Sequence, residues 1–230
     1  MKLSNKILLG AFLFIVLLLT GVHAALRIKY NSGDIVELNT YMTPGEQQRY
    51  FNNINHVMVI GMNQCSVFLS DSVYVSATDK MFNVIECRVQ GDTLYIDSKW
   101  HDKVKRHAQH GFYEAALYLP RGVTLSSLHS YINFWPGATV ASDILQQVRL
   151  DHSGFSIHLS GNSRQAGKMA LEAVQSSIHF APGMYFDSMS VTLQDNSRFM
   201  DERAAIQRLH LQMDSTSQVH LSGKNYNSMK

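Results

Sequence analysis

The chain has 230 residues, of which 45% are hydrophobic and 17% are charged, and its formal net charge is +2. This length and apolar content allow one large domain, or two small ones, with a substantial core. So small a net charge gives no support for the basic surface that is typical of nucleic-acid binding. Much of the polarity comes from Ser, Asn, Gln, Thr and His rather than from charged residues. That composition favours strands and turns over exposed helices.

An uncharged apolar run covers residues 7–26 and follows Lys2 and Lys6. Twenty helical residues rise about 30 Å, which is the thickness of a bilayer's hydrocarbon core, and the two lysines favour a cytoplasmic N-terminus. A cleaved signal peptide is the alternative, because Val22-His23-Ala24 has small residues where a signal peptidase requires them. We therefore predict an anchor or signal segment at 1–26.

Both hypotheses for this segment, an anchor and a cleaved signal peptide, predict that the remaining chain is exported to the cell envelope. The anchor predicts a single-pass inner-membrane protein whose C-terminal domain lies in the periplasm. The cleaved signal predicts a secreted or cell-surface protein. Residues 27–55, with a turn signal at Thr43-Pro44-Gly45, are interpreted as a membrane-proximal lead-in, and residues 56–230 as the head domain.

Short strands dominate from His56 onward. Residues 85–89 alternate apolar and polar side chains and lead through Gly91-Asp92 into 94–96, which predicts a hairpin. Residues 98–112 lack a strand pattern and are expected to form a polar loop carrying Trp100, His101, His107 and His110. Trp135 precedes Pro136-Gly137 and is interpreted as a hydrophobic residue that caps a turn rather than as a sugar platform.

The two cysteines, Cys65 and Cys87, alternate with apolar neighbours on such strands. Both are therefore predicted to face the core, and their spacing of 22 residues predicts neighbouring or near-neighbouring strands. No CxxC motif supports a zinc site. Export would allow a disulfide, and two buried free thiols are the alternative.

The C-terminal half is a repeat with a period near 20 residues. Four apolar triplets begin at intervals of 21, 21 and 20 residues, at Ile157, Ile178, Phe199 and Val219. A second apolar column precedes them at intervals of 21, 20 and 20 residues, at Leu150, Leu171, Val191 and Leu211. Two short strands per period predict an all-β solenoid, in which each coil buries its inward side chains by stacking on the next. An antiparallel sandwich is the alternative.

Several motifs occur in an order found in a known family, over about three quarters of the chain. They are Tyr50–Ile54, Gly91–Ile96, Ala116–Pro120, Val123–Leu128 and the repeats as far as Leu221-Ser222-Gly223. In these motifs the sequence resembles the head GIN domain family, whose members carry the label of putative auto-transporter adhesins. The resemblance implies a right-handed parallel β-helix-like fold behind an N-terminal transmembrane or signal helix, and an adhesive or structural role. It supplies no catalytic residue.

The acidic residues are scattered, and Asp201-Glu202 is the one acidic pair in the repeats. Adjacent residues of a strand face opposite sides, so this pair is a poor catalytic dyad. Motifs for a nucleophile, a metal or a phosphate are missing from the sequence. We predict a non-catalytic adhesin-like, structural or binding module without catalytic, cofactor or metal residues. The alternative is a carbohydrate-active β-helix enzyme, either a polysaccharide lyase or a hydrolase.

Three histidines, His158, His179 and His220, each occupy the middle of an apolar triplet, which alternation turns away from the core. The repeat predicts an outward row of these histidines with Met200 between the last two. We treat them as the candidate surface contact, strengthened toward anionic partners at mildly acidic pH; the alternative is that these exposed positions merely require a polar residue. The expected partners are the membrane, through the N-terminal helix, and a glycan or an envelope protein.

Overall fold

The computed structural model describes residues 12, 14–24, 27, 47–99, 114–136, 145–158, 165–202, 204–222 and 225. Two compact units are present, one containing the helical residues 14–24 and the other containing the strands. Over the described ranges, no helix is long and apolar enough to cross a membrane. Both ends of the apolar run at 7–26, most of the lead-in and the polar loop with Trp100, His101, His107 and His110 lie outside these ranges.

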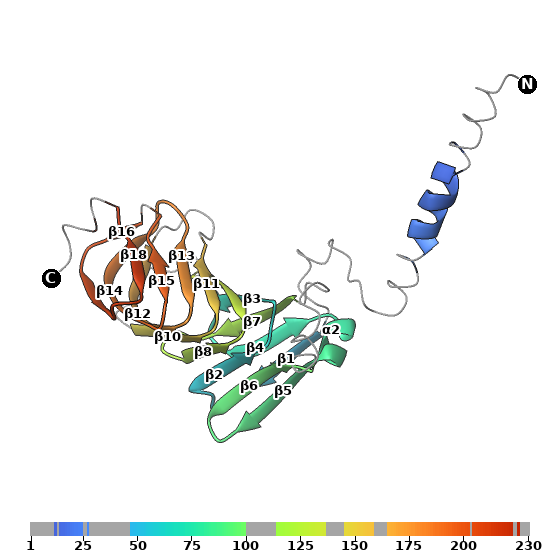
Figure 1. Cartoon of the computed structure of the whole chain (residues 1–230). Helices are drawn as coiled ribbons and strands as arrows, with labels where there is room; N and C mark the ends of the chain where they lie inside the picture. Colours follow the sequence, from blue (N-terminus) through green and yellow to red (C-terminus); the bar gives the residue numbers. More distant parts are fainter. Residues whose placement is uncertain are drawn as a thin grey trace, which may run out of the picture. The chain divides into compact units, whose positions relative to one another are not determined.

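The strand-rich unit is mostly β and contains two mixed nine-stranded sheets (Figure 1). We name as sheet A the strands β1 (Gln47–Phe51), β4 (Val73–Ala77), β7 (Glu114–Leu119), β3 (Gln64–Leu69), β9 (Tyr131–Trp135), β11 (Gly154–Ile157), β13 (Ser177–Phe180), β15 (Arg198–Met200) and β18 (Gln218–His220), in spatial order. Sheet B contains β16 (Ala205–Ile206), β14 (Tyr185–Gln194), β12 (Gln165–Val174), β10 (Leu145–Asp151), β8 (Thr124–Leu128), β2 (His56–Ile60), β6 (Thr93–Ser98) and β5 (Ile85–Gln90), with β17 (Leu209–Met213) also paired to β14.

From β8 onward the chain alternates between the two sheets. Strands β8, β10, β12, β14 and β17 of sheet B each lead through a short turn into a strand of sheet A, and equivalent strands pair in parallel. Apolar side chains on the inner faces form the core, where the rings of Phe180 in β13 and Phe186 in β14 lie 5.0 Å apart between centroids. A strand of either sheet therefore obtains its hydrogen bonds from the neighbouring repeats, which is why the repeat length is conserved along the stack.

The other end of the stack is irregular. Strand β1 pairs antiparallel with β4, and β4 pairs antiparallel with β7. The short helix α2 (Asp79–Val84) joins β4 to β5, and its N-cap is Thr78, whose hydroxyl accepts a hydrogen bond from the N–H of Met81. Strands β5 and β6 pair antiparallel, which confirms the hairpin predicted at 85–96.

The predicted core columns are correct for the later repeats and wrong by two residues for the first. Ile178 pairs with Phe199 and Phe199 with Val219, as predicted. The partner of Ile178 in β11, however, is Phe155 and not Ile157. In sheet B, Leu171 likewise pairs with Val148 and not with Leu150. A shift of two residues keeps the same side chains inward, so apolar periodicity alone did not separate the two registers.

The prediction that the cysteines lie on neighbouring strands is wrong. Cys65 is buried in β3 of sheet A, whereas Cys87 is partly exposed in β5 at the edge of sheet B. Both are free thiols. The 22 residues between them are not one repeat, because the chain forms β4 and α2 after β3 and only then returns to sheet B.

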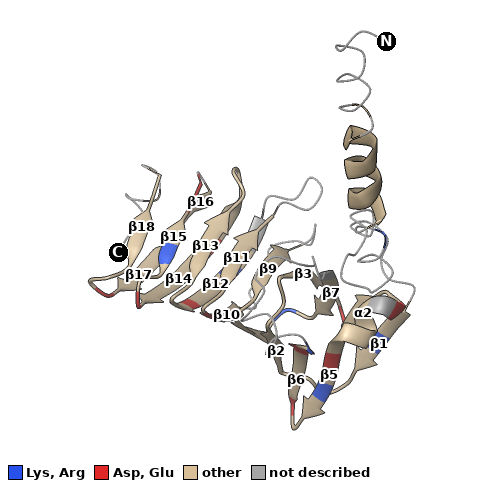
Figure 2. Ribbon diagram, turned by 45° about the vertical axis from the view of Figure 1, so that its right-hand side comes forward, with Lys and Arg blue, Asp and Glu red and all other residues tan. Residues whose placement is uncertain are grey.

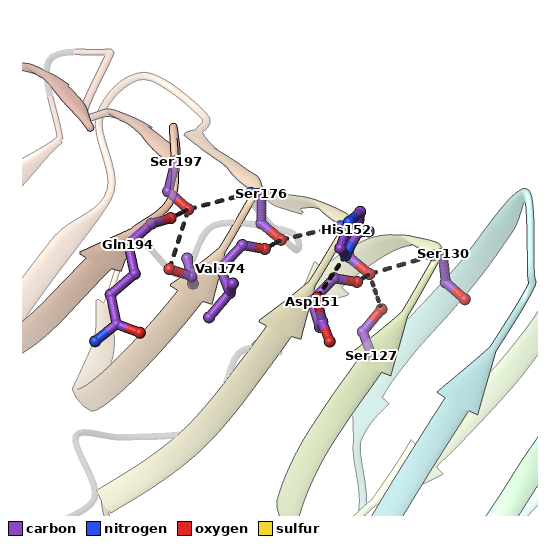
Figure 3. A network of polar contacts seen from close by, with 10 residues as sticks. Ser127, Ser130, Asp151, His152, Val174, Ser176, Gln194 and Ser197 are labelled. Carbon is purple, nitrogen blue, oxygen red and sulfur yellow. Dashed lines mark hydrogen bonds and ion pairs between the residues drawn. The ribbon is translucent and has the colours of Figure 1, made fainter. Parts of the chain in front are cut away.

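A row of buried serines follows the turns that lead from sheet B into sheet A (Figure 3). The N–H groups of Ser130, Ser153 and Ser176 donate to the hydroxyl of the serine in the next turn, at 3.2, 2.9 and 3.1 Å. The hydroxyls of Ser153, Ser176 and Ser197 each donate at 2.7 Å to a carbonyl of their own turn. These hydrogen bonds satisfy main-chain groups that the turns would otherwise leave buried without partners.

The residue before each of these serines has left-handed backbone geometry. The φ values are 50° for His129, 47° for His152, 48° for Gln175 and 66° for Asn196. Such values are uncommon outside glycine, and they turn each side chain outward while the following serine remains inside. The serine row and this left-handed row are both products of the repeat.

Candidate binding surface on sheet A

A continuous row of aromatic side chains crosses the outer face of sheet A. We define the aromatic row as Tyr50, Tyr74, Tyr118, Phe68, Trp135 and His158. The successive distances between ring centroids are 4.9, 4.2, 5.1, 6.2 and 4.6 Å. Neighbouring strands lie about 4.8 Å apart, so the distances between neighbouring rings are close to the spacing of the strands that carry them.

Strand pairing explains why these rings meet. Tyr74 is the direct partner of both Tyr50 and Tyr118, and Phe68 is the direct partner of both Tyr118 and Trp135. His158 follows β11, and its N–H donates to the carbonyl of Phe134 at 2.8 Å, which continues the same register. Neighbours such as Val67, Val75 and Leu117 are fully buried, so alternation directs the aromatic side chains to the outside.

The rings of the aromatic row stack on one another. The angle between ring planes is 5° for Tyr74 and Tyr118, 21° for Tyr118 and Phe68, and 11° for Phe68 and Trp135. Tyr50 at the edge strand is 62% exposed, and the other members are half-buried. Ring faces inside the row are therefore covered by neighbouring rings, and the row presents ring edges and tyrosine hydroxyls instead.

The row is uncharged over most of its length. Strands β3, β4, β9, β11 and β13 of sheet A contain no Lys, Arg, Asp or Glu. Figure 2 shows β9, β11 and β13 without the colours of charged residues. Burial, and then the neighbouring Tyr118 and Tyr50, raise the pKa of Tyr74 above its ordinary value of 10.0. The surface is consequently apolar, with tyrosine hydroxyl groups that can donate or accept hydrogen bonds.

Trp135 is a member of this row and not simply the cap of a turn. It stacks on His158 at 4.6 Å with 22° between the ring planes. His158 Nε2 lies 2.9 Å from Asn133 Oδ1. Burial lowers the pKa of His158, so this imidazole resists the protonation that the predicted acid-strengthened contact would require.

The structure brings together only part of the predicted histidine row. His179 pairs with Met200, and Met200 pairs with His220, so these three residues occupy adjacent strands as predicted. The partner of His179 in β11 is Ser156, whereas His158 lies two residues further along, beside Trp135. The misplacement of His158 has the same cause as the two-residue error in the core column.

Sequence reasoning missed the aromatic row because its members come from strands that are distant in the chain. Their spatial order is β1, β4, β7, β3 and β9, which no fixed period produces. A local signal was present nonetheless. In β4, β3 and β7 an aromatic residue stands among buried apolar ones at the alternate, outward position, as Tyr74, Phe68 and Tyr118 do.

No protein-family model matches the chain, and the search of curated proteins found no match. Among solved structures, a putative adhesin from Parabacteroides distasonis has 13% identity, covering 76% of this chain and 95% of its own, with a TM-score of 0.30. A putative lipid binding protein from the same organism has 8% identity, with coverages of 79% and 98% and a TM-score of 0.28. A putative adhesin from Parabacteroides merdae has 12% identity, with coverages of 78% and 99% and a TM-score of 0.26.

At these identities and TM-scores, none of the three structures assigns a function to this chain. The resemblance to the head GIN domain family remains a prediction from the sequence, because no family model supports it.

Proposed function

We propose that this chain is an exported, membrane-anchored, non-catalytic β-solenoid whose aromatic row contacts a protein partner in the cell envelope. The observation that carries the proposal is the unbroken stack from Tyr50 to His158 on the outer face of sheet A. Tyrosine and tryptophan supply large contact areas with few rotatable bonds, and for this reason they dominate binding energies in protein interfaces. Stacking restricts these side chains further before any partner arrives.

The ring orientation favours a protein over a sugar as the partner. A sugar packs its C–H groups on the face of an aromatic ring, and the faces inside the row are covered by neighbouring rings. Ring edges carry the positive part of the aromatic quadrupole and suit carbonyl oxygens, carboxylates and the faces of other aromatic rings. A polypeptide surface offers all three.

The parallel pairing supports the solenoid part of the proposal. One inward column runs through Ile132, Phe155, Ile178, Phe199 and Val219, at intervals of 23, 23, 21 and 20 residues. Connections between parallel strands of one sheet are almost always right-handed, so we propose a right-handed coil. The apolar run at 7–26 supports the anchor.

The environments of several carboxylates support a role without catalysis. Asp214 accepts the N–H of Asp195 at 2.7 Å, and Asp201 is buried, where its side chain accepts hydrogen bonds from Ser222 and Asn225. Arg149 lies 3.1 Å from Glu172 on the adjacent strand. These groups hold turns and strands in place, which is a structural use of their charge.

A binding assay tests the proposed function. The full-length protein is solubilised in detergent, attached to beads and incubated with envelope fragments of the organism that makes it. We expect the double variant Tyr50→Ser, Trp135→Ser to lower binding at least tenfold. Val89→Ser, an exposed apolar position on sheet B, is the matched control and is expected to bind as the unmodified protein does. Equal binding by the aromatic variant would contradict the proposal.

Treatment of the fragments identifies the class of partner. Protease digestion is expected to abolish binding, and periodate oxidation of vicinal diols is expected to leave it unchanged. Binding that survives protease digestion but is lost after periodate oxidation would indicate a glycan partner instead of a protein. Mass spectrometry of the mature chain tests the anchor separately, since an N-terminus before Ile7 supports it and a start at Ala25 replaces it with a cleaved signal peptide.

A further inference from the structure

Two histidines meet on the turns at the edge between the sheets, away from the aromatic row. His129 lies in the turn between β8 and β9, and His152 lies in the turn between β10 and β11. Their ring centroids are 4.8 Å apart, and the ring planes are inclined by 55°. Both residues are exposed, so the pair is accessible to a small ligand.

The backbone holds this pair in place from both sides. His129 N–H donates to the carbonyl of Asp151 at 3.1 Å, and His152 N–H donates to the carbonyl of Val174 at 3.0 Å. Each histidine has left-handed backbone geometry and precedes a buried serine of the serine row. Gln175 and Asn196 occupy the same place in the next two turns. The fold therefore accepts other residues here, and imidazoles are not required by the turn itself.

A carboxylate orients one of the two imidazoles. His152 Nδ1 lies 2.6 Å from Asp151 Oδ1, and because an ionised carboxylate only accepts, the Nδ1–H group donates this hydrogen bond. The Nε2 atom of His152 then carries the free lone pair. Metal-binding histidines commonly have such an arrangement, because a carboxylate on one ring nitrogen sets the tautomer and raises the basicity of the other.

The separation of the rings suits a shared metal ion. An imidazole nitrogen binds zinc at about 2.0–2.1 Å, which puts the centroids of two rings at a right to tetrahedral angle roughly 4.5–5.2 Å apart. The observed 4.8 Å lies within this range. The inclination of 55° between the ring planes is compatible with nitrogens that converge on one point.

We infer that His129 and His152 bind one divalent transition-metal ion, of the kind that imidazole prefers, such as Zn²⁺ or Cu²⁺. Asp151 acts from the outer shell through His152. In the part of the chain that the structure describes, no group of three His, Cys, Asp or Glu residues is arranged to hold a metal. The ion would thus retain water at its remaining positions or take ligands from a partner molecule, as open metal sites do.

Calorimetric titration of the full-length protein with ZnCl₂ tests this site. The reference protein carries His101→Gln, His107→Gln and His110→Gln, so that the loop histidines do not contribute. His129→Asn and His152→Asn are the test variants, because asparagine tolerates left-handed geometry and already occupies position 196. His179→Asn is the matched control, since it removes an exposed imidazole from a different row.

We expect the reference protein to bind Zn²⁺ in one strong step, and each test variant to weaken this step at least tenfold. Asp151→Asn should weaken it by roughly 10- to 100-fold, the usual effect of losing an outer-shell carboxylate. His179→Asn should bind as the reference does. Thermal unfolding followed by circular dichroism shows whether each variant is folded, and a zinc-dependent rise in Tm should occur in the reference protein and the control alone. Folded His129→Asn and His152→Asn variants that bind Zn²⁺ as tightly as the reference would overturn the inference.

Discussion

The rings of Tyr74 and Tyr118 lie 4.2 Å apart, with only 5° between their planes. The two residues are direct partners on the antiparallel strands β4 and β7. Here the irregular strands at one end of sheet A continue the same outward row that the parallel strands begin. The aromatic row therefore joins the two kinds of pairing, and its contacts have a predictable effect on stability.

We expect Tyr74→Leu and Tyr118→Leu each to reduce the free energy of unfolding, and the double variant to lose less than the sum. The coupling energy from the double-mutant cycle should be about 0.5–1.5 kcal/mol, the value typical of aromatic pairs beyond their area burial. Urea unfolding of the four proteins measures it. The same cycle with Tyr74 and Tyr95, which lie in different sheets, is the control and should be additive. Additive effects for Tyr74 and Tyr118 would show that the stacking itself contributes nothing.

The serine row predicts unequal effects for the same substitution at two positions. Ser176→Ala removes a buried hydroxyl that accepts the N–H of Ser153 and donates to Val174, so unfolding should become easier by about 1–3 kcal/mol. The hydroxyl of Ser217, in the last turn, is buried without a hydrogen-bond partner among the described residues. Ser217→Ala should therefore change stability little. Chemical denaturation measures the free energy of unfolding of both variants. Equal losses of this free energy would contradict the proposed role of the serine row.

Asp214 predicts a loss of stability in acid. The N–H of Asp195 above all, and then hydrogen bonds from the N–H of Ser217 and from the hydroxyl and N–H of Thr216, hold the pKa of Asp214 well below its ordinary value of 3.8. As the pH falls, the unfolded chain binds the proton before the folded chain does, so this contribution is complete above the unfolded pKa and is lost progressively below it.

Thermal melts between pH 7 and pH 2.5 measure this effect. Asp214→Asn should lower Tm at neutral pH and should show a shallower decline below about pH 4 than the unmodified protein. Asp71→Asn, in another exposed turn, is the control for the change in net charge. Parallel curves for Asp214→Asn and the unmodified protein would show that Asp214 has no part in acid unfolding.

The cysteines predict slow thiol labelling of the folded protein. Cys65 is fully buried, and burial raises the pKa of the Cys87 thiol to about 11. Thiolate is the reactive form, and at pH 8 most of the Cys87 thiol is protonated, so its reaction is slow. Labelling of the native chain with an alkylating reagent should be slow, and unfolding without a reductant should expose two reactive thiols. Unfolded protein that remains unlabelled would indicate a disulfide.

The sequence by itself determined the β character of the chain, the repeat and the inward positions of most strands. The spacing of Ile178, Phe199 and Val219 was sufficient to identify the repeat and its inward positions, because alternation and a constant repeat length are local properties of the chain. The outward direction of His179 and His220 followed from the same alternation. The periodicity gave the correct face for Ile157 and His158 as well, but not their register.

Only the tertiary structure decided which residues are neighbours across the strands. A shift by two residues leaves every side chain on its original face, so the pairing of Phe155 with Ile178 depends on how turns of unequal length close. The aromatic row depends on the insertion of β4 and β7 beside β3, which lies outside any repeat. The pairing of His129 with His152 likewise requires the left-handed turns and the serine row to stack. Such contacts arise from the packing of distant segments, and periodicity in one sequence does not encode them.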